Sequence, residues 1–176
     1  ITVEGDYSNA AFLDAFNLFG GNVMVKGLSS RSVQGDMVYR DIFKELSNGC
    51  PSIDVSDCPD LAPIIMAVAA AKNGAKLTGT NRLRIKESDR GEAMKAELEK
   101  MGAKVLVEDN KITVKKANLH FPERPVFSHN DHRIVMAMSV LLSITGGEII
   151  GAEAVAKSYP KFFDDILSLG IKVKVV

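Results

Sequence analysis

A repeated pattern of apolar segments that end at glycine is the strongest constraint on the fold of this chain. The pattern occurs at residues 8–28, 60–80 and 131–154. Each copy begins with Ser or Asp, whose side-chain oxygen can cap the free N–H groups of a helix start. About ten mostly apolar residues follow, and a glycine then ends the predicted helix before a short strand. This repetition predicts three similar structural units.

A second, amphipathic helix pattern follows each apolar segment, as in "VYRDIFKELSNG", "GEAMKAELEKMGA" and "YPKFFDDILSLGI". Alternation in "KVLVEDNKITVKK" and "IKVKVV" then predicts strands with one exposed face. We therefore expect units of about 1–58, 59–116 and 117–176. The tail of the first unit, within 44–63, is short and leaves little room for a complete hairpin. No unit could bury its apolar helix alone, so the three must pack together.

The polarity of the elements predicts which of them lie inside. The segments "APIIMAVAAA" and "RIVMAMSVLLSI" are apolar almost all round, which is typical of buried helices. The strands alternate instead, whereas a doubly wound parallel sheet would have near-continuous apolar strands. We therefore predict an α+β, inside-out prism, in which three buried parallel helices are surrounded by three small mixed sheets with threefold pseudosymmetry.

Length and charge restrict the classes of function. At 176 residues and 46% hydrophobic residues, the chain is long enough for one domain, 1–176, with a substantial core. The 22 Lys and Arg residues balance the 22 Asp and Glu residues, so no overall field would attract nucleic acid or an anionic membrane. The chain also lacks aromatic platforms for nucleic acid. We expect any anion site to be local.

Cysteine use and hydropathy indicate the compartment. Cys50 and Cys58 form neither a zinc pattern nor a disulfide framework, so we expect reduced thiols in the cytoplasm. Lys72 interrupts the longest apolar run, 61–71, below the roughly 18 residues that a membrane helix needs. No signal peptide is visible, and from the start at Ile1 we expect a segment of a longer protein.

The predicted helix starts suggest a place for anions. If the three apolar helices are parallel, their starts at Ser8, Asp60 and Asp131 converge at one end of the domain. Free N–H groups and the positive ends of the helix dipoles would make that end attractive to an anion. Helix starts are common, so the residues around them must carry the prediction.

The segment "RIKESDR" places Lys86, Glu87 and Arg90 at the entry to the second amphipathic helix, which Ser88 or Glu87 could cap. The simplest interpretation is a solvated helix start with local ion pairs. However, cations at a helix N-terminus are disfavoured by the dipole. A bound anion would reverse that effect.

The segment "HNDHR" precedes the third apolar helix and contains His129, Asp131, His132 and Arg133. Its spacing is not the i, i+4 histidine pair of a metalloprotease, so we expect no metal here. Arg133 lies in the first predicted turn, where a carboxylate or phosphate that binds it bidentately is a better explanation. We expect His132 to be a packed histidine.

Lys157, in "AKSYPKFF", occupies the position in the third unit that Lys86 occupies in the second. The repeat register then brings Lys86, Arg90, Arg133 and Lys157 to one end of the domain. Asp60 adds a carboxylate there, unless it only caps a helix. Such a set suits general acid–base chemistry on a substrate with several negative charges.

The segments "RIKESDR", "NDHR" and "AKSYP", with "VEGDYSNAAF" and "VQGD" before them, resemble the 5-enolpyruvylshikimate-3-phosphate synthases across essentially the whole chain. The resemblance implies a two-domain protein with three units in each domain and an active site in the cleft between them. This chain is similar to the C-terminal domain only. The N-terminal domain, and a short N-terminal segment that the family packs into the C-terminal domain, are expected to lie outside it.

The resemblance also implies ligands and roles. Arg90, Arg133 and Lys157 would bind phosphoenolpyruvate, whereas Asp60 and Lys86 would bind shikimate 3-phosphate. Asp60 would accept the proton of the attacking 5-hydroxyl group. We expect enolpyruvyl transfer to that hydroxyl, as in aromatic amino-acid biosynthesis, with no metal or other cofactor and a monomeric protein.

Three further residues have implied roles. Glu87 is similar to a carboxylate that exchanges a proton at the enolpyruvate methylene, and Asp131 and His132 would support the site. We expect that charge reversal at Arg90 would leave folding intact. The chain alone is expected to fold but to be inactive.

Two other functions remain open on the sequence. One is the sister family that transfers enolpyruvate to UDP-N-acetylglucosamine, although it lacks the "KESDR" and "NDHR" pairing. The other is a non-catalytic anion-binding module. Ligand-dependent thermal shifts would distinguish them.

Overall fold

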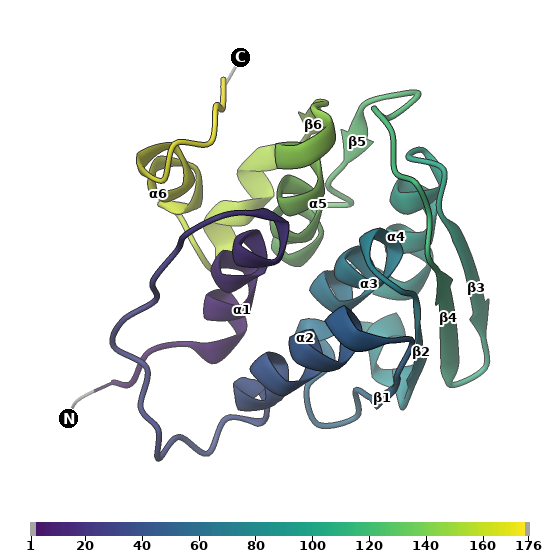
Figure 1. The fold of residues 1–176 in the computed structure, drawn as a ribbon, viewed down its shortest axis with the longest axis horizontal. Helices are drawn as coiled ribbons and strands as arrows, with labels where there is room; N and C mark the ends of the chain where they lie inside the picture. Colours follow the sequence, from purple (N-terminus) through teal and green to yellow (C-terminus); the bar gives the residue numbers. More distant parts are fainter. Residues whose placement is uncertain (1–2, 175–176) are drawn as a thin grey trace.

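The computed structural model describes residues 3–174 and consists of six α-helices, six short strands and several 3-10 turns (Figure 1). The α-helices are α1 (Tyr7–Ala15), α2 (Tyr39–Asn48), α3 (Ala62–Ala71), α4 (Arg90–Glu99), α5 (His132–Thr145) and α6 (Phe162–Ser168). The strands are β1 (Ser52–Asp54), β2 (Ala75–Thr78), β3 (Lys104–Glu108), β4 (Lys111–Lys115), β5 (Val126–Phe127) and β6 (Ile149–Ile150). The 3-10 turns are η1 (Phe16–Phe19), η2 (Gly35–Val38), η3 (Pro59–Leu61), η4 (Thr80–Ile85) and η5 (Ala152–Lys157).

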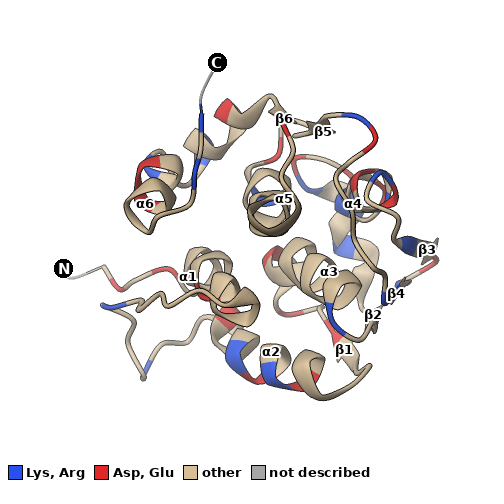
Figure 2. Cartoon of the chain, turned by 45° about the horizontal axis from the view of Figure 1, so that its top comes forward, with Lys and Arg blue, Asp and Glu red and all other residues tan. Residues whose placement is uncertain are grey.

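Three helices form the interior. Figure 2 shows α1, α3 and α5 at the centre, with α2, α4 and α6 around them. Helix α3 is buried from Ala62 to Ala70, and α5 is buried from His132 to Leu141. Helices α1, α3 and α5 contact one another, because an all-round apolar helix is stable only inside. The prediction of interior helices is confirmed.

A four-stranded mixed sheet in the order β1-β2-β4-β3 covers one side of α3 and α4. Strand β1 is parallel to β2, and the other two pairings are antiparallel. Leu77 pairs with Ile112, and Val105 pairs with Val114, and all four side chains are buried. The alternate residues of these strands are more exposed. The predicted strands with one exposed face are therefore confirmed for this sheet.

The number of sheets differs from the prediction of three. Within residues 3–174 there are two, and the second pairs only β5 with β6, in parallel. The short strand expected after the glycine in 8–28, near 23–26, does not form, and neither does a strand in 171–174, the described part of "IKVKVV"; residues 175–176 lie outside the described part. A strand needs a hydrogen-bonded neighbour, and β1, the one strand of the short first unit, pairs with β2 instead. The result is an α+β fold, and its threefold symmetry stays a prediction.

Acidic side chains cap three of the helices. Asp6 caps α1 by accepting from the backbone N–H of Ser8 at 2.8 Å, so the cap lies two residues before the one predicted. Asp131 caps α5 as predicted. Helix α4 is capped by Asp89. These caps satisfy N–H groups at the end of the domain where the predicted site lies.

Both cysteines are free thiols: Cys58 is buried and Cys50 is exposed. Among residues 3–174, no helix combines the length and the apolar character needed to cross a membrane.

We predict that Ile65→Ala, in the middle of α3, destabilises the protein by about 2–5 kcal/mol, because it leaves a cavity between the inner helices. Urea denaturation measures this as a lower midpoint. The matched change Ile144→Ala, at a side chain of α5 that is 52% exposed, should reduce the free energy of unfolding by less than about 1 kcal/mol. Equal losses would contradict a core centred on α3.

Candidate functional site

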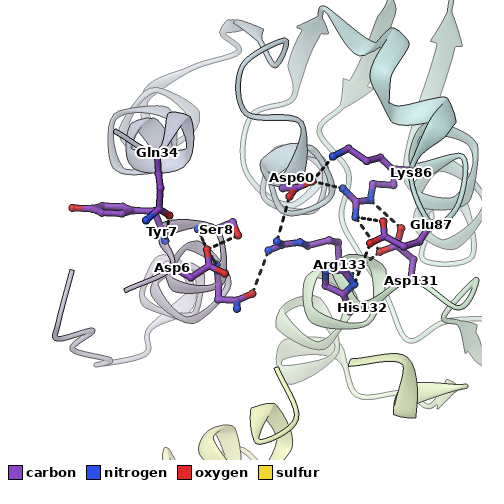
Figure 3. Close-up of polar contacts among 12 residues, drawn as sticks. Asp6, Tyr7, Ser8, Gln34, Asp60, Lys86, Glu87, Asp131, His132 and Arg133 are labelled. Carbon is purple, nitrogen blue, oxygen red and sulfur yellow. Dashed lines mark hydrogen bonds and ion pairs between the residues drawn. The ribbon is translucent and has the colours of Figure 1, made fainter. Parts of the chain in front are cut away.

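Polar side chains from several parts of the chain meet where the inner helices begin (Figure 3). Arg133, in the first turn of α5, donates to Asn9 Oδ1 of α1 at 3.2 Å and to Asp60 Oδ2, just before α3, at 3.4 Å. Arg90, at the start of α4, donates to Asp60 Oδ1 at 2.7 Å. The starts of the inner helices therefore lie together, as predicted. We define the polar cluster as Asp60, Lys86, Glu87, Arg90, Asp131 and Arg133.

Arg90 is the central charge of the polar cluster. Its side chain is only 1% exposed and donates to three carboxylates. Nε lies 2.9 Å from Asp131 Oδ2, and the two terminal nitrogens each lie 2.7 Å from an oxygen of Asp60 or Glu87. A buried guanidinium needs such partners, because an unpaired charge in the interior is very unfavourable.

Asp60 contacts three cations. Besides Arg90 and Arg133, it binds Lys86, whose Nζ lies 3.0 Å from Oδ1. Burial alone would raise the pKa of Asp60, but the charge of Arg133 and the hydrogen bonds from Arg90 and Lys86 outweigh it and lower the pKa to about 2. The alternative role of a helix cap is wrong, because neither η3 nor α3 has a side-chain cap.

Asp131 is fully buried and accepts hydrogen bonds from both arginines of the polar cluster, Arg90 and Arg133. It accepts from the backbone N–H of Arg133 at 2.9 Å, from Arg90 and from Ser88 Oγ at 3.0 Å. Burial alone would raise the pKa of Asp131, but the hydrogen bond and the charge of Arg90 outweigh burial, so the pKa lies below its usual value. Ser88 therefore holds Asp131 and does not cap α4 as we had suggested.

Glu87 and His132 lie beside each other at the edge of the polar cluster (Figure 3). The Glu87 side chain is 37% exposed, the most open of the three carboxylates, and it does not cap α4 either. His132 is buried, and burial followed by the charge of Arg133 lowers its pKa. Its Nδ1 lies 3.7 Å from Glu87 Oε1, too far for a hydrogen bond. His132 is therefore a packed histidine, as predicted.

The two lysines differ in position. Lys86 belongs to the polar cluster through its ion pair with Asp60. Lys157, at the end of η5, is exposed, and its Nζ donates to the backbone carbonyl of Asn130 at 2.5 Å. Since Asn130 directly precedes Asp131, Lys157 lies next to the polar cluster, and its hydrogen bond goes to the backbone and not to a side chain of the cluster.

The counter-charges of these cations come from the protein itself. Three carboxylates, those of Asp60, Glu87 and Asp131, already balance Lys86, Arg90 and Arg133. One donor is left over: Nε of Arg133 is buried and has no hydrogen-bond partner within residues 3–174. Buried donors without partners are rare, so an acceptor from outside this chain would fit here.

Sequence reasoning missed two members of the site. Asn9 accepts from Arg133 across 124 positions of sequence, which no local pattern reveals. Asp36, in η2, has a buried Oδ1 without a partner in the described part of the chain. Burial and then the charge of Asp60 raise its pKa to about 6. Its motif "VQGD" contributed to the family resemblance, but we had given the aspartate no role.

Residues 3–174 contain no group of three His, Cys, Asp or Glu side chains placed to hold a metal ion.

We predict that Arg90→Met destabilises the protein by about 3–5 kcal/mol, because it strands the buried carboxylates of Asp131 and Asp60. Chemical denaturation measures this loss. It replaces our earlier expectation that charge reversal at Arg90 would leave folding intact. Arg84→Met is the control, since Arg84 is half exposed and 3.7 Å from an exposed carboxylate, and it should change little. A stable Arg90→Met protein would contradict the central position of Arg90.

A second prediction concerns Asp36 and pH. Its folded pKa is raised from 3.8 to about 6, so its contribution to stability is present at low pH and is lost as the pH rises through about 6. Asn resembles the neutral form, so Asp36→Asn should be more stable than the wild type by about 2 kcal/mol near pH 7.5, with a much smaller gain near pH 4. Denaturation at the two pH values tests this, and an equal gain at both would contradict it.

Comparison with known proteins agrees with the geometry. The sequence pattern described as EPSP synthase (3-phosphoshikimate 1-carboxyvinyltransferase) matches residues 47–166. A 3-phosphoshikimate 1-carboxyvinyltransferase of Clostridium acetobutylicum is 42% identical over 96% of this chain and 43% of its own length. That of Thermococcus kodakarensis is 37% identical over 95% of this chain and 46% of its own length. The chain thus spans less than half the length of these relatives.

A solved structure gives the same result. EPSP synthase from Acinetobacter baumannii matches with a TM-score of 0.60 and 25% identity, over 99% of this chain and 42% of that one. The sequence match and the shared fold together show that the chain belongs to the EPSP synthase (3-phosphoshikimate 1-carboxyvinyltransferase) family.

Proposed function

We propose that this chain supplies half of an active site that transfers the enolpyruvyl group of phosphoenolpyruvate to the 5-hydroxyl group of shikimate 3-phosphate. The observation that carries the proposal is Arg133: a buried guanidinium at a helix start, with Nε free of partners in the described part of the chain. Such a group favours a planar or tetrahedral anion. The names of the relatives identify which anions to test first.

The chain is, on this proposal, the C-terminal domain of a two-domain protein, with units of about 1–58, 59–116 and 117–176 around a pseudo-threefold axis. The interior position of α1, α3 and α5 supports this arrangement. The coverage of less than half of each relative supports a second domain, which on this proposal faces the polar cluster. The protein acts as a cytoplasmic monomer and uses no cofactor.

Phosphoenolpyruvate binds to Arg133, Lys157 and Arg90. Arg133 offers its unpaired Nε, and Lys157 is exposed beside the same helix start. Arg90 is enclosed by carboxylates, so it joins the ligand only when the exposed side chain of Glu87 turns aside. The ligand then replaces protein carboxylates as the counter-charge, at a place where helix dipoles also favour it.

Shikimate 3-phosphate binds to Lys86 and Asp60. Lys86 neutralises the ligand phosphate, while Asp60 accepts the proton of the 5-hydroxyl group. The three cations around Asp60 keep it ionised at neutral pH, which a proton acceptor requires.

The reaction consists of an addition followed by an elimination. The methylene carbon of phosphoenolpyruvate takes up a proton, and the 5-hydroxyl oxygen forms a bond to the neighbouring carbon as it loses its own proton. The methyl group then returns a proton, the bond to the phosphate oxygen breaks, and inorganic phosphate leaves. Positive groups fixed in a closing cleft stabilise the charge that develops.

Glu87 exchanges the proton at the methylene carbon. Its position supports this role, because it is the most exposed carboxylate of the polar cluster and lies beside His132. Asp131 and His132 support the site: Asp131 orients both Arg90 and the start of α5, and His132 packs behind Glu87.

The experiment compares the full-length protein that contains this chain with the chain alone. Phosphate release from phosphoenolpyruvate and shikimate 3-phosphate should occur with the full-length protein and not with the chain. Arg133→Met in the full-length protein should lower kcat/KM by roughly 100-fold, because it removes charge-assisted hydrogen bonds to the ligand.

Arg124→Met is the matched control, since Arg124 is exposed and lies outside the polar cluster, and it should leave kcat/KM unchanged. Turnover by the chain alone would contradict the half-site. Turnover of UDP-N-acetylglucosamine, or anion binding without turnover by the full-length protein, would instead identify one of the two other functions considered above.

A further inference from the structure

A second buried carboxylate lies seven residues further along α4, the helix that begins with Arg90. Glu97, on α4, is 1% exposed and accepts three hydrogen bonds. Lys100 Nζ lies 2.6 Å and the backbone N–H of Phe127 2.9 Å from Oε2, and His129 Nε2 lies 2.8 Å from Oε1. Because a carboxylate can only accept, His129 carries a proton on Nε2. Glu97 thus holds the segment that leads into α5.

Glu97 and Arg90 grip that segment from one side of one helix. They are seven residues apart, about two turns, so their side chains project from the same face of α4. Arg90 holds Asp131 at the start of α5, and Glu97 holds Phe127 and His129 before it. Helices α4 and α5 pack together, so both ends of the segment are fixed to one rigid element.

The segment between these two attachments has an uncommon backbone. His129 and Asn130 have φ values of 51° and 54°, in the left-handed region that residues other than glycine rarely adopt. This turn aims the Asn130 carbonyl at Lys157 Nζ and brings Asp131 into its capping position. Without an external hold, such a turn would relax toward ordinary backbone angles.

We infer that Glu97 is a positioning residue: through His129 and the Phe127 N–H it fixes the left-handed turn, and so places Asp131, Arg133 and Lys157 in the site. Glu97 is buried, and its hydrogen bonds go to Lys100, Phe127 and His129. The identity of the ligand that these groups bind rests on the proposed function. The hold on the turn does not.

Two variants test the inference in the full-length protein. In Glu97→Gln, only one acceptor oxygen remains, so the side chain can no longer accept from both His129 and Phe127. In His129→Asn, the buried pair of Glu97 and Lys100 is kept, and Asn tolerates the left-handed conformation. Glu99→Gln is the matched control, because it removes the same charge from an exposed position of α4.

Hydrogen exchange gives the structural readout. Protection of the backbone amides of residues 128–133 should fall by about tenfold in Glu97→Gln and His129→Asn, and should not change in Glu99→Gln. Exchange in α3 should stay the same in all three proteins. Protection of 128–133 within about twofold of the wild type in both variants would overturn the inference.

Kinetics gives a readout that loss of stability alone would not produce. KM for phosphoenolpyruvate should rise by about tenfold in both variants, while KM for shikimate 3-phosphate, held by Lys86 and Asp60, stays within about twofold. A parallel rise of both constants would overturn the inference. A third outcome is that the wild-type protein shows no turnover while the two variants still exchange faster. This result would support the hold on the turn and overturn the proposed ligands.

Discussion

The buried guanidinium of Arg90 is the constraint on which the site depends. A charge that is 1% exposed must be compensated, and its three carboxylate partners come from different parts of the chain. Asp60 precedes α3, Asp131 begins α5, and Glu87 lies in the segment before α4. Any rearrangement of these elements would leave a charge unpaired in the interior. The ion pairs that stabilise the fold in this region are therefore the same ones that set the geometry of the polar cluster.

The polar cluster is an electrically balanced group, and this changes how an anion must enter it. A field of unpaired cations would attract an anion directly. Here every cation already has a carboxylate partner, so an incoming anion would have to use the one unpaired donor, Nε of Arg133, or displace a carboxylate. Exchange of partners needs less reorganisation of the protein than assembly of charges, since Arg90 and Arg133 are already fixed at the starts of α4 and α5, whose side chains are largely buried.

Sequence reasoning predicted the convergence of the polar cluster better than the sheets. The apolar character of "APIIMAVAAA" depends only on local composition, so the interior position of α3 could be predicted. The convergence of Arg90, Arg133 and Asp60 followed from the repeat register. By contrast, the contact of Asn9 with Arg133 depends on two helices packing at a given rotation, and strands 23–26 and 171–174 depend on neighbours that the described chain does not provide. Secondary-structure propensity alone can predict neither the rotation of the two helices nor the neighbours of the strands.

The position of Asp60 between three cations has a consequence for how proton and ligand occupancy influence each other. Its acidity depends chiefly on Arg133 against the effect of burial. An anion that drew Arg133 away would weaken that influence and make Asp60 more basic. By thermodynamic reciprocity the converse also holds: protonation of Asp60 would free Arg133 from this ion pair and strengthen the binding of an anion to Arg133.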